Sequence, residues 1–592
     1  MIYFLNKNSR RFHDSLLKIS HNSYKEILRQ VQDSSILVMD NVTSANEFTK
    51  LSKKIKGDNF FCIFKKDDLV FLGPFMETSN DACPFCVLLT LAIDEANVKI
   101  LSSENANKLN EKNEIDFIVK DVKQTIHCIN TKDESIAYLK KPLAHPGCSH
   151  YVILKKTDIL KENILSTLEL RDILENKYTG IIRQIISLKD LASKELTRKM
   201  GSYEVLLSRF QNPVFYLYPH VGFLDTAVGS DFSFNTALTK IIFETIERYS
   251  VLSIPKSQPD KIGTHKQLEG KAINPDRFWR YDSEQLLKNK FPFKEIKKTS
   301  RFRWRKMFSP ILENTLVPED FIYINFEKPS PYHSNTTSGC AADVNIDNAC
   351  LRAVLELIER DNVMRHWAKG ESMPQFDLST AKGEIKENID FVNNLGFDIK
   401  IINCSRLESV YTFIIFLVNK SALRPRVMIT SACALKPEEA ILKGFNEAIG
   451  GILISLVLEE TTKPRYLKTN EIEDPRDHAN YYRDPKTFKV LKHFYESSGT
   501  FSLADLKNKN YGDNALSIVK NLLLHLKRLG IDVYFIDQTF SPLKKFGVKV
   551  IRAVSPELMP LVFGTGMLKL GGTKSELFKY AKIATKYPHP YA

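Results

Sequence analysis

Two segments of this 592-residue chain carry the same acidic pattern, and the repetition limits the folds that the chain can adopt. Both segments read Glu-x-x-Glu-Arg, the first beginning at Glu244 and the second at Glu356, 112 residues later. Side chains three or four residues apart share one face of a helix, so each segment presents two carboxylates with an arginine just past them. The pattern therefore predicts two helices with concentrated charge on one face.

The apolar residues of the second predicted helix indicate where its two carboxylates lie relative to the core. Four apolar residues at helical spacing form a stripe that we expect to face the core, and both glutamates lie beside it. Carboxylates at a core edge are unfavourable unless cations neutralise them, as Mg²⁺ carried by a nucleotide does. A salt-bridged surface helix explains either copy alone, but two copies favour a binding site. The stripe residues are Leu351, Val354, Leu355 and Ile358.

Charge and hydropathy narrow the classes of partner. The 84 basic and 70 acidic residues give a net charge of +14, which favours anionic partners such as nucleotides or acidic peptides. The basic residues are spread as singles and pairs, so charge alone does not imply nucleic-acid binding. No apolar run approaches the roughly 18 residues of a membrane span, and the first residues lack a signal-peptide pattern. We expect a cytoplasmic protein.

The coarse pattern predicts an α/β fold with at least two domains. In the first segment, Ser35–Met39 is expected to form a strand, residues 46–55 a helix, and residues 60–64 with 69–72 a hairpin that ends at Gly73-Pro74. Residues 164–199 are polar and helix-rich, typical of a joint between domains. Beyond them, strands at 410–418 and 426–430 precede a helix at 438–449. Residues 253–298 are expected to be irregular.

Nine cysteines are too few for a disulfide framework. Cys83 and Cys86 form a C-x-x-C, whose spacing lets two thiolates face one zinc ion, and Cys148 with His150 is a candidate second pair. His145 or Cys128 are alternative fourth ligands. Four later cysteines in apolar surroundings are expected to be buried thiols. These are Cys340, Cys350, Cys404 and Cys433.

The segments around the two acidic motifs, TSGCAADVNIDNACLRAVLELIERD and ALTKIIFETIERYS, resemble the YcaO family of ATP-dependent peptide-backbone-modifying enzymes. The resemblance runs from about Leu170 to the C-terminus and includes residues 434–448 and 547–564. The ending PHPYA resembles the proline-rich tail of peptide cyclodehydratases. The segments LGPFMETSNDACPFC and KPLAHPGCSH resemble the zinc-bearing part of the ubiquitin-activating-enzyme-like (ThiF-like) subunit that accompanies them in thiazole/oxazole-modified microcin and thiopeptide biosynthesis.

The resemblance implies a zinc-bearing scaffold or docking domain at residues 1–165 and a larger YcaO-type α/β domain at 166–592. It implies ATP-dependent cyclodehydration of Cys, Ser or Thr in a ribosomally made precursor peptide to thiazoline or oxazoline rings, through phosphorylation of the amide oxygen. It assigns Mg-ATP contacts to Glu244, Glu247, Arg248, Glu356, Glu359, Arg360, Lys240, Ser338 and Glu447, and catalytic positions to Lys443, Tyr591 and Ala592. It assigns structural Zn²⁺ to Cys83, Cys86, Cys148 and His150.

The chain departs from the family pattern at several positions. A usual serine is Lys240, a usual glutamate is Asn348, and the usual Gln and Arg after the third helix fall on Gly450 and Ile452. The fourth zinc cysteine falls on Tyr151. These changes leave a catalytically weakened scaffold that binds peptide or a partner enzyme as the alternative to an active enzyme. A zinc-containing nucleic-acid binder is a third hypothesis, resting only on charge and one C-x-x-C.

The resemblance also implies partners: a precursor peptide with leader and core, a separate ThiF-like leader-binding protein, and a flavin-dependent azoline dehydrogenase. We expect a homodimer and neither a nucleic-acid nor a membrane partner.

Overall fold

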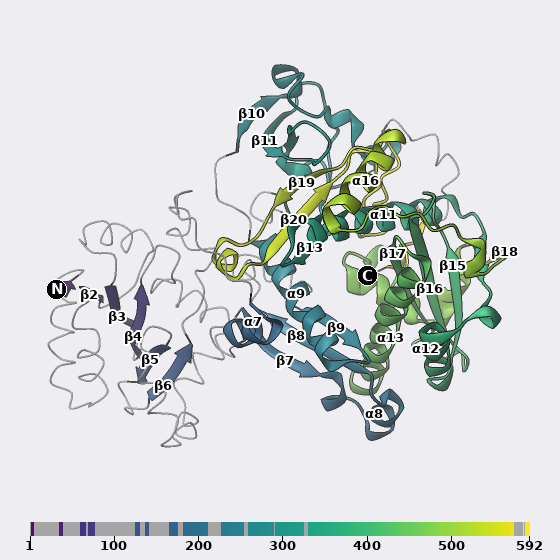
Figure 1. Ribbon diagram of the computed structural model, residues 1–592, viewed down its shortest axis with the longest axis horizontal. Coiled ribbons are helices and arrows are strands. Elements are labelled where there is room, and N and C mark those ends of the chain that lie inside the picture. Colours follow the sequence, from purple (N-terminus) through teal and green to yellow (C-terminus); the bar gives the residue numbers. More distant parts are fainter. Residues whose placement is uncertain are drawn as a thin grey trace.

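The computed structural model describes residues 165–175, 181–210, 226–253, 259–288, 291–324, 329–572, 584 and 586–591, together with six strands between residues 2 and 140. These six strands form one sheet at one end of the molecule, in the order of the sequence (Figure 1). The first three strands are parallel and the others antiparallel. They are β1 (Ile2–Phe4), β2 (Ser35–Met39), β3 (Phe60–Lys66), β4 (Leu69–Met76), β5 (Thr125–Asn130) and β6 (Ile136–Lys140).

The predicted strand at Ser35–Met39 and the hairpin after it are confirmed. The predicted break at Gly73-Pro74 is wrong, because β4 runs through both residues to Met76. The pairing of β3 with β4 shifts register at this point, between Phe61 and Ile63. Proline is tolerated in a strand at such an irregularity, where its missing N–H is not needed for the ladder. The helix predicted at residues 46–55 lies outside the described residues.

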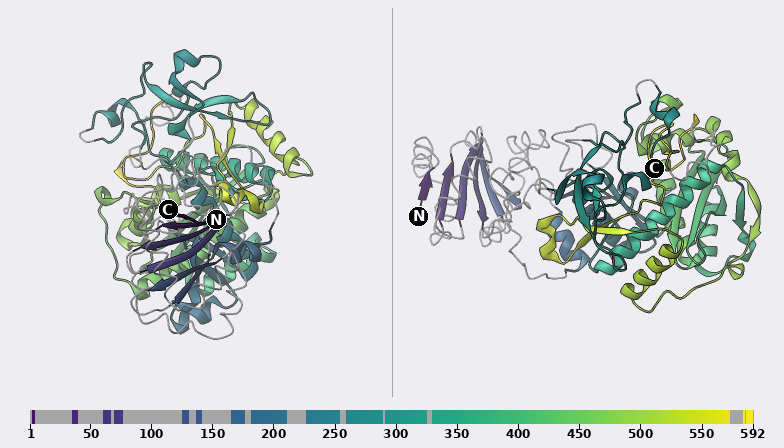
Figure 2. Two further views of the ribbon diagram at one scale, coloured as in Figure 1. Left: turned by 90° about the vertical axis from the view of Figure 1, so that its left-hand side faces the viewer. Right: turned by 90° about the horizontal axis from the view of Figure 1, so that it is seen from above.

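Four further sheets lie in the described part of the chain, and three of them pack against the central helices (Figures 1 and 2). The first is antiparallel and contains β7 (Ile182–Ser187), β8 (Glu204–Phe210) and β9 (Thr226–Asp231). The second contains β13 (Cys340–Asp343), β20 (Lys549–Val554) and β19 (Tyr534–Asp537), again antiparallel. The third has the order β17 (Val427–Ala434), β16 (Tyr411–Asn419), β15 (Phe397–Asn403), β14 (Met373–Phe376) and β18 (Ser497–Phe501).

A small sheet of β10 (Lys261–Thr264), β11 (Arg301–Met307) and β12 (Thr315–Pro318) lies at the top of Figure 1. The segment at 253–298 is therefore not wholly irregular, since β10 pairs with β11. The helices outside the centre are α7 (Thr167–Leu174), α8 (Lys194–Met200), α10 (Ser283–Leu286), α12 (Gly383–Asn394), α14 (Pro475–Arg483), α15 (Lys492–Tyr495) and α16 (Ala515–Arg528). The predicted joint at 164–199 contains α7 and α8 but also β7, whose buried Ile182 pairs it to β8.

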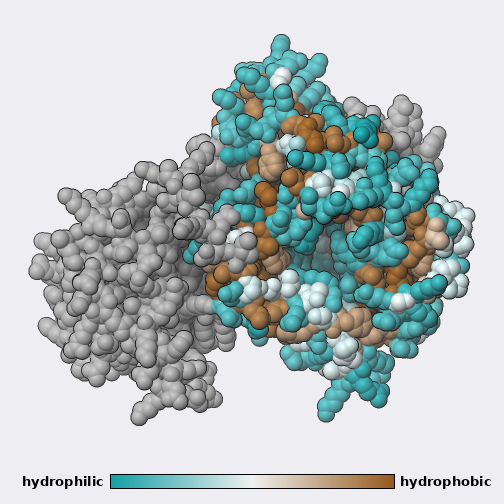
Figure 3. Space-filling model, in the orientation of Figure 1, coloured by the Kyte–Doolittle hydropathy of each residue, from teal (hydrophilic) through white to brown (hydrophobic). Residues whose placement is uncertain are grey.

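Three long helices connect the sheets: α9 (Phe234–Leu252), α11 (Ile346–Lys369) and α13 (Pro437–Thr461). Helix α9 packs against β8 and β9 and also against β13, α11 packs against β13, β20 and β17, and α13 packs against β16, β17 and β9. Each helix therefore touches two sheets, and the three surround a common centre. The face seen in Figure 3 is hollowed there, between the parts that Figure 1 assigns to α9 and α13.

Helix α13 is much longer than the predicted 438–449. By length and composition alone it could cross a membrane. Its apolar residues are instead used as in a core helix, because Ile441, Phe445 and Ile449 are fully buried in the cluster that includes β15 and β16. Burial of such side chains is the main source of stability for a helix of this kind.

Candidate functional site

Helix α9 carries the first Glu-x-x-Glu-Arg motif. Its start is capped by Ser233, whose hydroxyl accepts from the Thr236 N–H. Glu244 forms an ion pair with Arg248, with Oε1 at 2.7 Å from Nη2, and its Oε2 accepts from the Val228 N–H at 3.0 Å. Glu247 lies one turn nearer the centre and has no hydrogen-bond or ion-pair partner among the described residues.

Helix α11 carries the second motif and holds it differently. Glu359 is 2% exposed and accepts from the Ser431 hydroxyl at 2.8 Å and the Cys433 N–H at 3.1 Å, both on β17. Arg360 Nη1 donates to the same carboxylate at 2.8 Å, and Arg360 Nη2 lies 3.5 Å from Glu356 Oε1. Glu356 is therefore the more accessible carboxylate of this copy, with 22% of its side chain exposed.

The apolar stripe of α11 is only partly as predicted. Val354 and Ile358 are buried, but Leu351 and Leu355 are half-buried at the margin of the same cluster. The reason is that α11 is enclosed by two sheets and α16, so its second half is buried on nearly every side rather than along one stripe.

Helix α13 adds a lysine and a fifth carboxylate. Lys443 Nζ lies 3.9 Å from Glu359 Oε2, and the Lys443 side chain is 51% exposed. Glu447, one turn further along α13, is also in contact with solvent. Partial dehydration in the hollow raises the pKa of Glu447 to about 7; Lys443 opposes this rise, and repulsion from Glu359 adds to it.

The five glutamates from the three helices repel one another across this centre. The pKa of Glu247 is raised well above its ordinary value. Dehydration is the largest cause, and repulsion from Glu356 and Glu244 adds to it. Dehydration likewise raises the pKa of Glu356; Arg360 opposes this, and Glu359 adds to it. Cations oppose this repulsion from the same helices, namely Arg248, Arg352, Arg360 and Lys443, and Arg552 of β20 adds to them. The pKa values of Glu247 and Glu356 stay raised all the same, and a bound divalent cation would relieve this dehydration and repulsion.

The donor set fits Mg²⁺ brought by a nucleotide better than a preformed metal site. In the part of the chain that the structure describes, no three Asp, Glu, His or Cys side chains converge closely enough to hold an ion. Mg²⁺ typically binds through one or two carboxylates plus substrate phosphates and keeps several waters. Glu247 and Glu356 supply such carboxylates, while Arg360 and Lys443 offer cationic groups to phosphates.

Two of the predicted nucleotide residues lie at the margin of this centre. Lys240 Nζ contacts Asp231 Oδ2 at 2.8 Å and donates to the Ser230 carbonyl at 2.9 Å. Its charge is therefore already neutralised by β9. Ser338 lies in the turn before β13, 6% exposed, with its hydroxyl accepting from the Thr336 hydroxyl. It lines a small cavity rather than the carboxylate centre.

The C-terminal tail is buried against α14. Tyr482 donates to the Pro588 carbonyl at 2.7 Å, and His478 Nδ1 donates to the His589 carbonyl at 2.7 Å. Tyr591 is 3% exposed; dehydration raises the pKa of its hydroxyl, Glu359 adds to this rise and Arg360 opposes it, so the ring lies close to both. The tail thus reaches the α11 copy of the motif, while the predicted Ala592 lies outside the described residues.

The predicted zinc ligands Cys83, Cys86, Cys148 and His150 also lie outside the described residues, so the zinc site stays a prediction. The later cysteines are buried free thiols, as expected.

The altered family positions on α13 do not face the centre. Ile452 is fully buried in the core below the sheet, and a Cβ at Gly450 would come within 2.6 Å of the Ser230 hydroxyl. An arginine at 452 would therefore be a buried charge, which is strongly unfavourable. Asn348 is exposed in the first turn of α11.

Sequence reasoning missed several residues of the site. Ser431 and Cys433 hold Glu359 from β17, and Arg552 on β20 donates to the Thr336 carbonyl at 2.8 Å and lies close enough to Glu356 to lower its pKa. Of these residues, only Arg552 could have been recognised from the sequence, because it is a charged residue within the otherwise apolar strand segment VIRAV.

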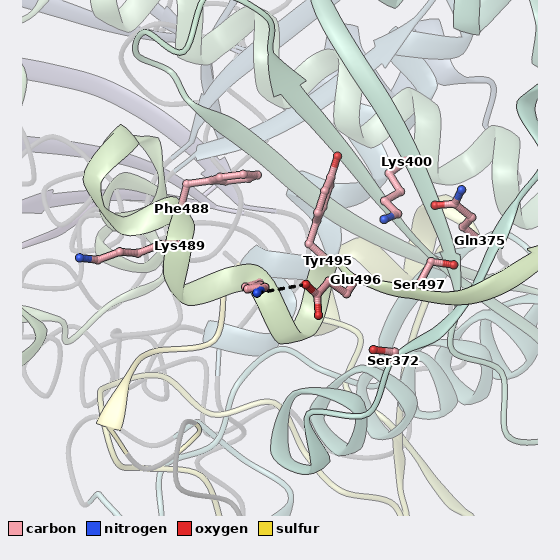
Figure 4. Close-up of a pocket in the computed structure, with 9 residues that line it drawn as sticks. Ser372, Gln375, Lys400, Phe488, Lys489, Tyr495, Glu496 and Ser497 are labelled. Atoms are coloured by element: carbon pink, nitrogen blue, oxygen red, sulfur yellow. Dashed lines mark ion pairs between the residues drawn. The ribbon is translucent and has the colours of Figure 1, made fainter.

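A larger cavity, of about 690 Å³, lies elsewhere on the third sheet (Figure 4). It is lined from β14, β15 and β18 and includes Lys400, whose ammonium lies 4.2 Å from the Tyr495 ring centroid. It contains none of the predicted site residues, so size does not identify the functional site here.

Comparison with known proteins agrees with this location. The model of the family described as YcaO cyclodehydratase, ATP- and Mg²⁺-binding, matches residues 228–559. No curated protein sequence matches the chain. A solved heterocyclase in complex with substrate and cofactor is 15% identical with a TM-score of 0.68, over 91% of this chain and 79% of that one. The heterocyclase TruD is 14% identical with a TM-score of 0.59, over 94% and 79%. At these identities the structural matches show a shared fold, and their coverage extends well outside residues 228–559.

Proposed function

Because this chain belongs to the YcaO family of ATP- and Mg²⁺-binding cyclodehydratases, we propose that it closes thiazoline or oxazoline rings at Cys, Ser or Thr of a ribosomally synthesised precursor peptide. Its activity is that of an ATP-dependent cyclodehydratase that forms heterocycles in peptides. The observation that carries the proposal is the convergence of both Glu-x-x-Glu-Arg motifs with Lys443 at one hollow between three helices.

The reaction needs nucleotide because an amide oxygen is a very poor leaving group. The substrate thiol or hydroxyl adds to the preceding carbonyl carbon, and the oxygen receives the terminal phosphoryl group of ATP. The addition closes the ring; phosphate then leaves with that oxygen, the amide nitrogen loses its proton, and a C=N bond forms within the ring. The balance is one water removed from the peptide and one ATP converted to ADP and phosphate.

The residues of the hollow divide this work. Glu247 and Glu356 would hold Mg²⁺, which supplies charge neutralisation and orientation of the phosphates when it is bound. Arg360 and Lys443 stabilise the negative charge on the transferring phosphoryl group, since fixed cations in a partly dehydrated site act strongly. Glu359 fixes Arg360 through its bonds to β17 and so keeps that guanidinium in place.

The C-terminal tail completes the active site in this proposal. Tyr591, with the following Ala592 carboxylate, orients the reacting amide beside the α11 motif. Its support is the burial of residues 588–591 against α14 and the interaction of Tyr591 with Glu359 and Arg360. Two prolines in this segment also reduce the entropy lost when it is held.

The N-terminal region has a docking role in this proposal. Residues 1–165 form a zinc-bearing scaffold with Cys83, Cys86, Cys148 and His150 as ligands, supported by the C-x-x-C spacing. A separate ThiF-like protein captures the leader peptide, and a flavin-dependent dehydrogenase then oxidises azolines in the cytoplasm. Elemental analysis finding less than about 0.2 zinc per chain contradicts the zinc assignment.

The test of the function combines peptide mass and phosphate release. The purified chain, Mg-ATP, a Cys-containing precursor and the leader-binding partner should yield peptide lighter by one water per ring, with one phosphate released for each. Glu356→Gln should abolish both signals, while the surface variant Glu195→Gln should retain them. Release of phosphate without any loss of water from the peptide contradicts the proposal.

A further inference from the structure

A small cavity beside the carboxylate centre contains basic groups, and the described residues of its wall include no carboxylate. It lies between β20, the turn that precedes β13, and the segment that contains Lys569. Its polar lining comes from His333, Ser338, Arg552 and Lys569, with Leu357 of α11 on one side. The cavity is the one into which the sequence-predicted Ser338 faces.

Lys569 is the most unusual group in this wall. Its side chain is only 3% exposed, and no described residue forms an ion pair or hydrogen bond with it. A buried lysine without an anionic partner is strongly unfavourable, and such groups are seldom retained without one. Burial lowers the pKa of Lys569 to about 7, so that an anion nearby would restore its charge.

Two neighbours of Lys569 have buried nitrogens without partners among the described residues, and that of Arg552 is a donor. His333 is 4% exposed and donates its Nδ1–H to the Ser334 carbonyl, so its buried Nε2, which has no partner among the described residues, is an acceptor in the neutral ring. Arg552 is 4% exposed and uses Nη1 on Thr336, while its Nε has no partner in the same part of the chain. Buried donors of this kind usually indicate an absent acceptor.

The volume of the cavity limits what that acceptor is. It measures about 60 Å³. One water needs roughly 10 to 15 Å³ on such a measure, so the space holds a few waters or one small oxyanion. A nucleotide is far too large, which separates this cavity from the ATP site itself.

We propose that this cavity is an anion site for a phosphate ion, held by Lys569 and Arg552 with the Ser338 hydroxyl as a further donor. The existence of the site is independent of the reaction. Its assignment to the phosphate that leaves the peptide rests on the proposed function.

The cavity lies where phosphate released by the reaction could be bound. Arg552 influences the pKa of Glu356 on one side and that of His333 on the other, so it lies between the carboxylate centre and the cavity. Phosphate that has left the reacting amide would meet this arginine first. An ADP molecule could remain at the three helices while phosphate occupies the cavity.

The experiment measures binding of inorganic phosphate to the full chain by calorimetry, with chloride at matched ionic strength as the blank. The probe is titrated with and without saturating Mg-ADP. Lys569→Met removes the buried charge but keeps an apolar stem, and Lys266→Met removes an exposed charge as the matched control. Ser338→Ala is the mild second variant, should Lys569→Met fail to fold.

Saturable phosphate binding that survives Mg-ADP, falls at least ten-fold in Lys569→Met, falls measurably in Ser338→Ala and is unchanged in Lys266→Met is the expected result. Absence of saturable binding to the wild-type chain overturns the site, and so does equal affinity in Lys569→Met. Displacement by Mg-ADP overturns it too, because phosphate would then occupy the nucleotide site. Phosphate binding in a chain that forms no rings would remove only the product assignment.

Discussion

The two copies of Glu-x-x-Glu-Arg have the same sequence pattern but very different surroundings. In both, the arginine pairs with the glutamate four residues before it, at 2.7 Å on α9 and 3.5 Å on α11. The surroundings of the second glutamate of each motif differ. Glu359 is buried and held by two donors from β17, whereas Glu247 has no partner among the described residues and is repelled by its neighbours.

This difference separates two roles that one motif can serve. A saturated, buried carboxylate fixes the geometry of its neighbours, and its loss is mainly structural. An unpartnered carboxylate with a raised pKa is poised to bind a cation, at the expense of stability in the ligand-free protein. We therefore assign fixation to Glu359 and ligand binding to Glu247 and Glu356.

The largest expected effect is the loss of Glu359. Glu359→Ala leaves Arg360, the Ser431 hydroxyl and the Cys433 N–H without their acceptor, which should destabilise the protein by about 3 to 5 kcal/mol. Denaturant or thermal unfolding measures this. Stability within about 0.5 kcal/mol of wild type would contradict the structural role and make the two copies equivalent.

The next effect concerns the tail that packs beside the α11 copy alone. Tyr591→Ala removes a buried aromatic ring and should destabilise by about 2 to 4 kcal/mol. Tyr591→Phe should leave stability nearly unchanged, because the hydroxyl has no hydrogen-bond partner among the described residues. Loss of ring formation in the stable Phe variant would show that the hydroxyl acts on substrate; full activity in the Ala variant would exclude a role for the tail.

The smallest effect has the opposite sign. Glu247→Gln should stabilise the ligand-free protein at pH 8, because the neutral amide removes the repulsion that the carboxylate meets from Glu356 and Glu244. The folded pKa is raised above the unfolded value, so the folded state binds more protons and wild-type stability falls as pH rises from about 4.5. The advantage of the variant should therefore vanish below about pH 4.

Unfolding curves at pH 4 and pH 8 measure this difference, with Glu195→Gln on the surface of α8 as the control. An advantage that is equal at both pH values would contradict the raised pKa of Glu247.

The sequence was sufficient for some parts of this account and not for others. Helical spacing predicts that Glu356 and Glu359 share a face, and alternation predicts the hairpin of β3 and β4, because both are properties of one local segment. The donors Ser431 and Cys433 come from a strand more than 70 residues away, and periodicity carries no information about which strand packs on which helix. The family resemblance places a usual arginine at position 452, but here Ile452 is buried in the core.

The most direct test of the central claim is the affinity of the ligand-free chain for Mg-ADP, measured by calorimetry. If the hollow between α9, α11 and α13 is the nucleotide site, Glu247→Gln and Glu356→Gln should each weaken binding at least ten-fold, while Glu195→Gln leaves it unchanged. Wild-type affinity in both variants would contradict the assignment of this centre to Mg-nucleotide binding.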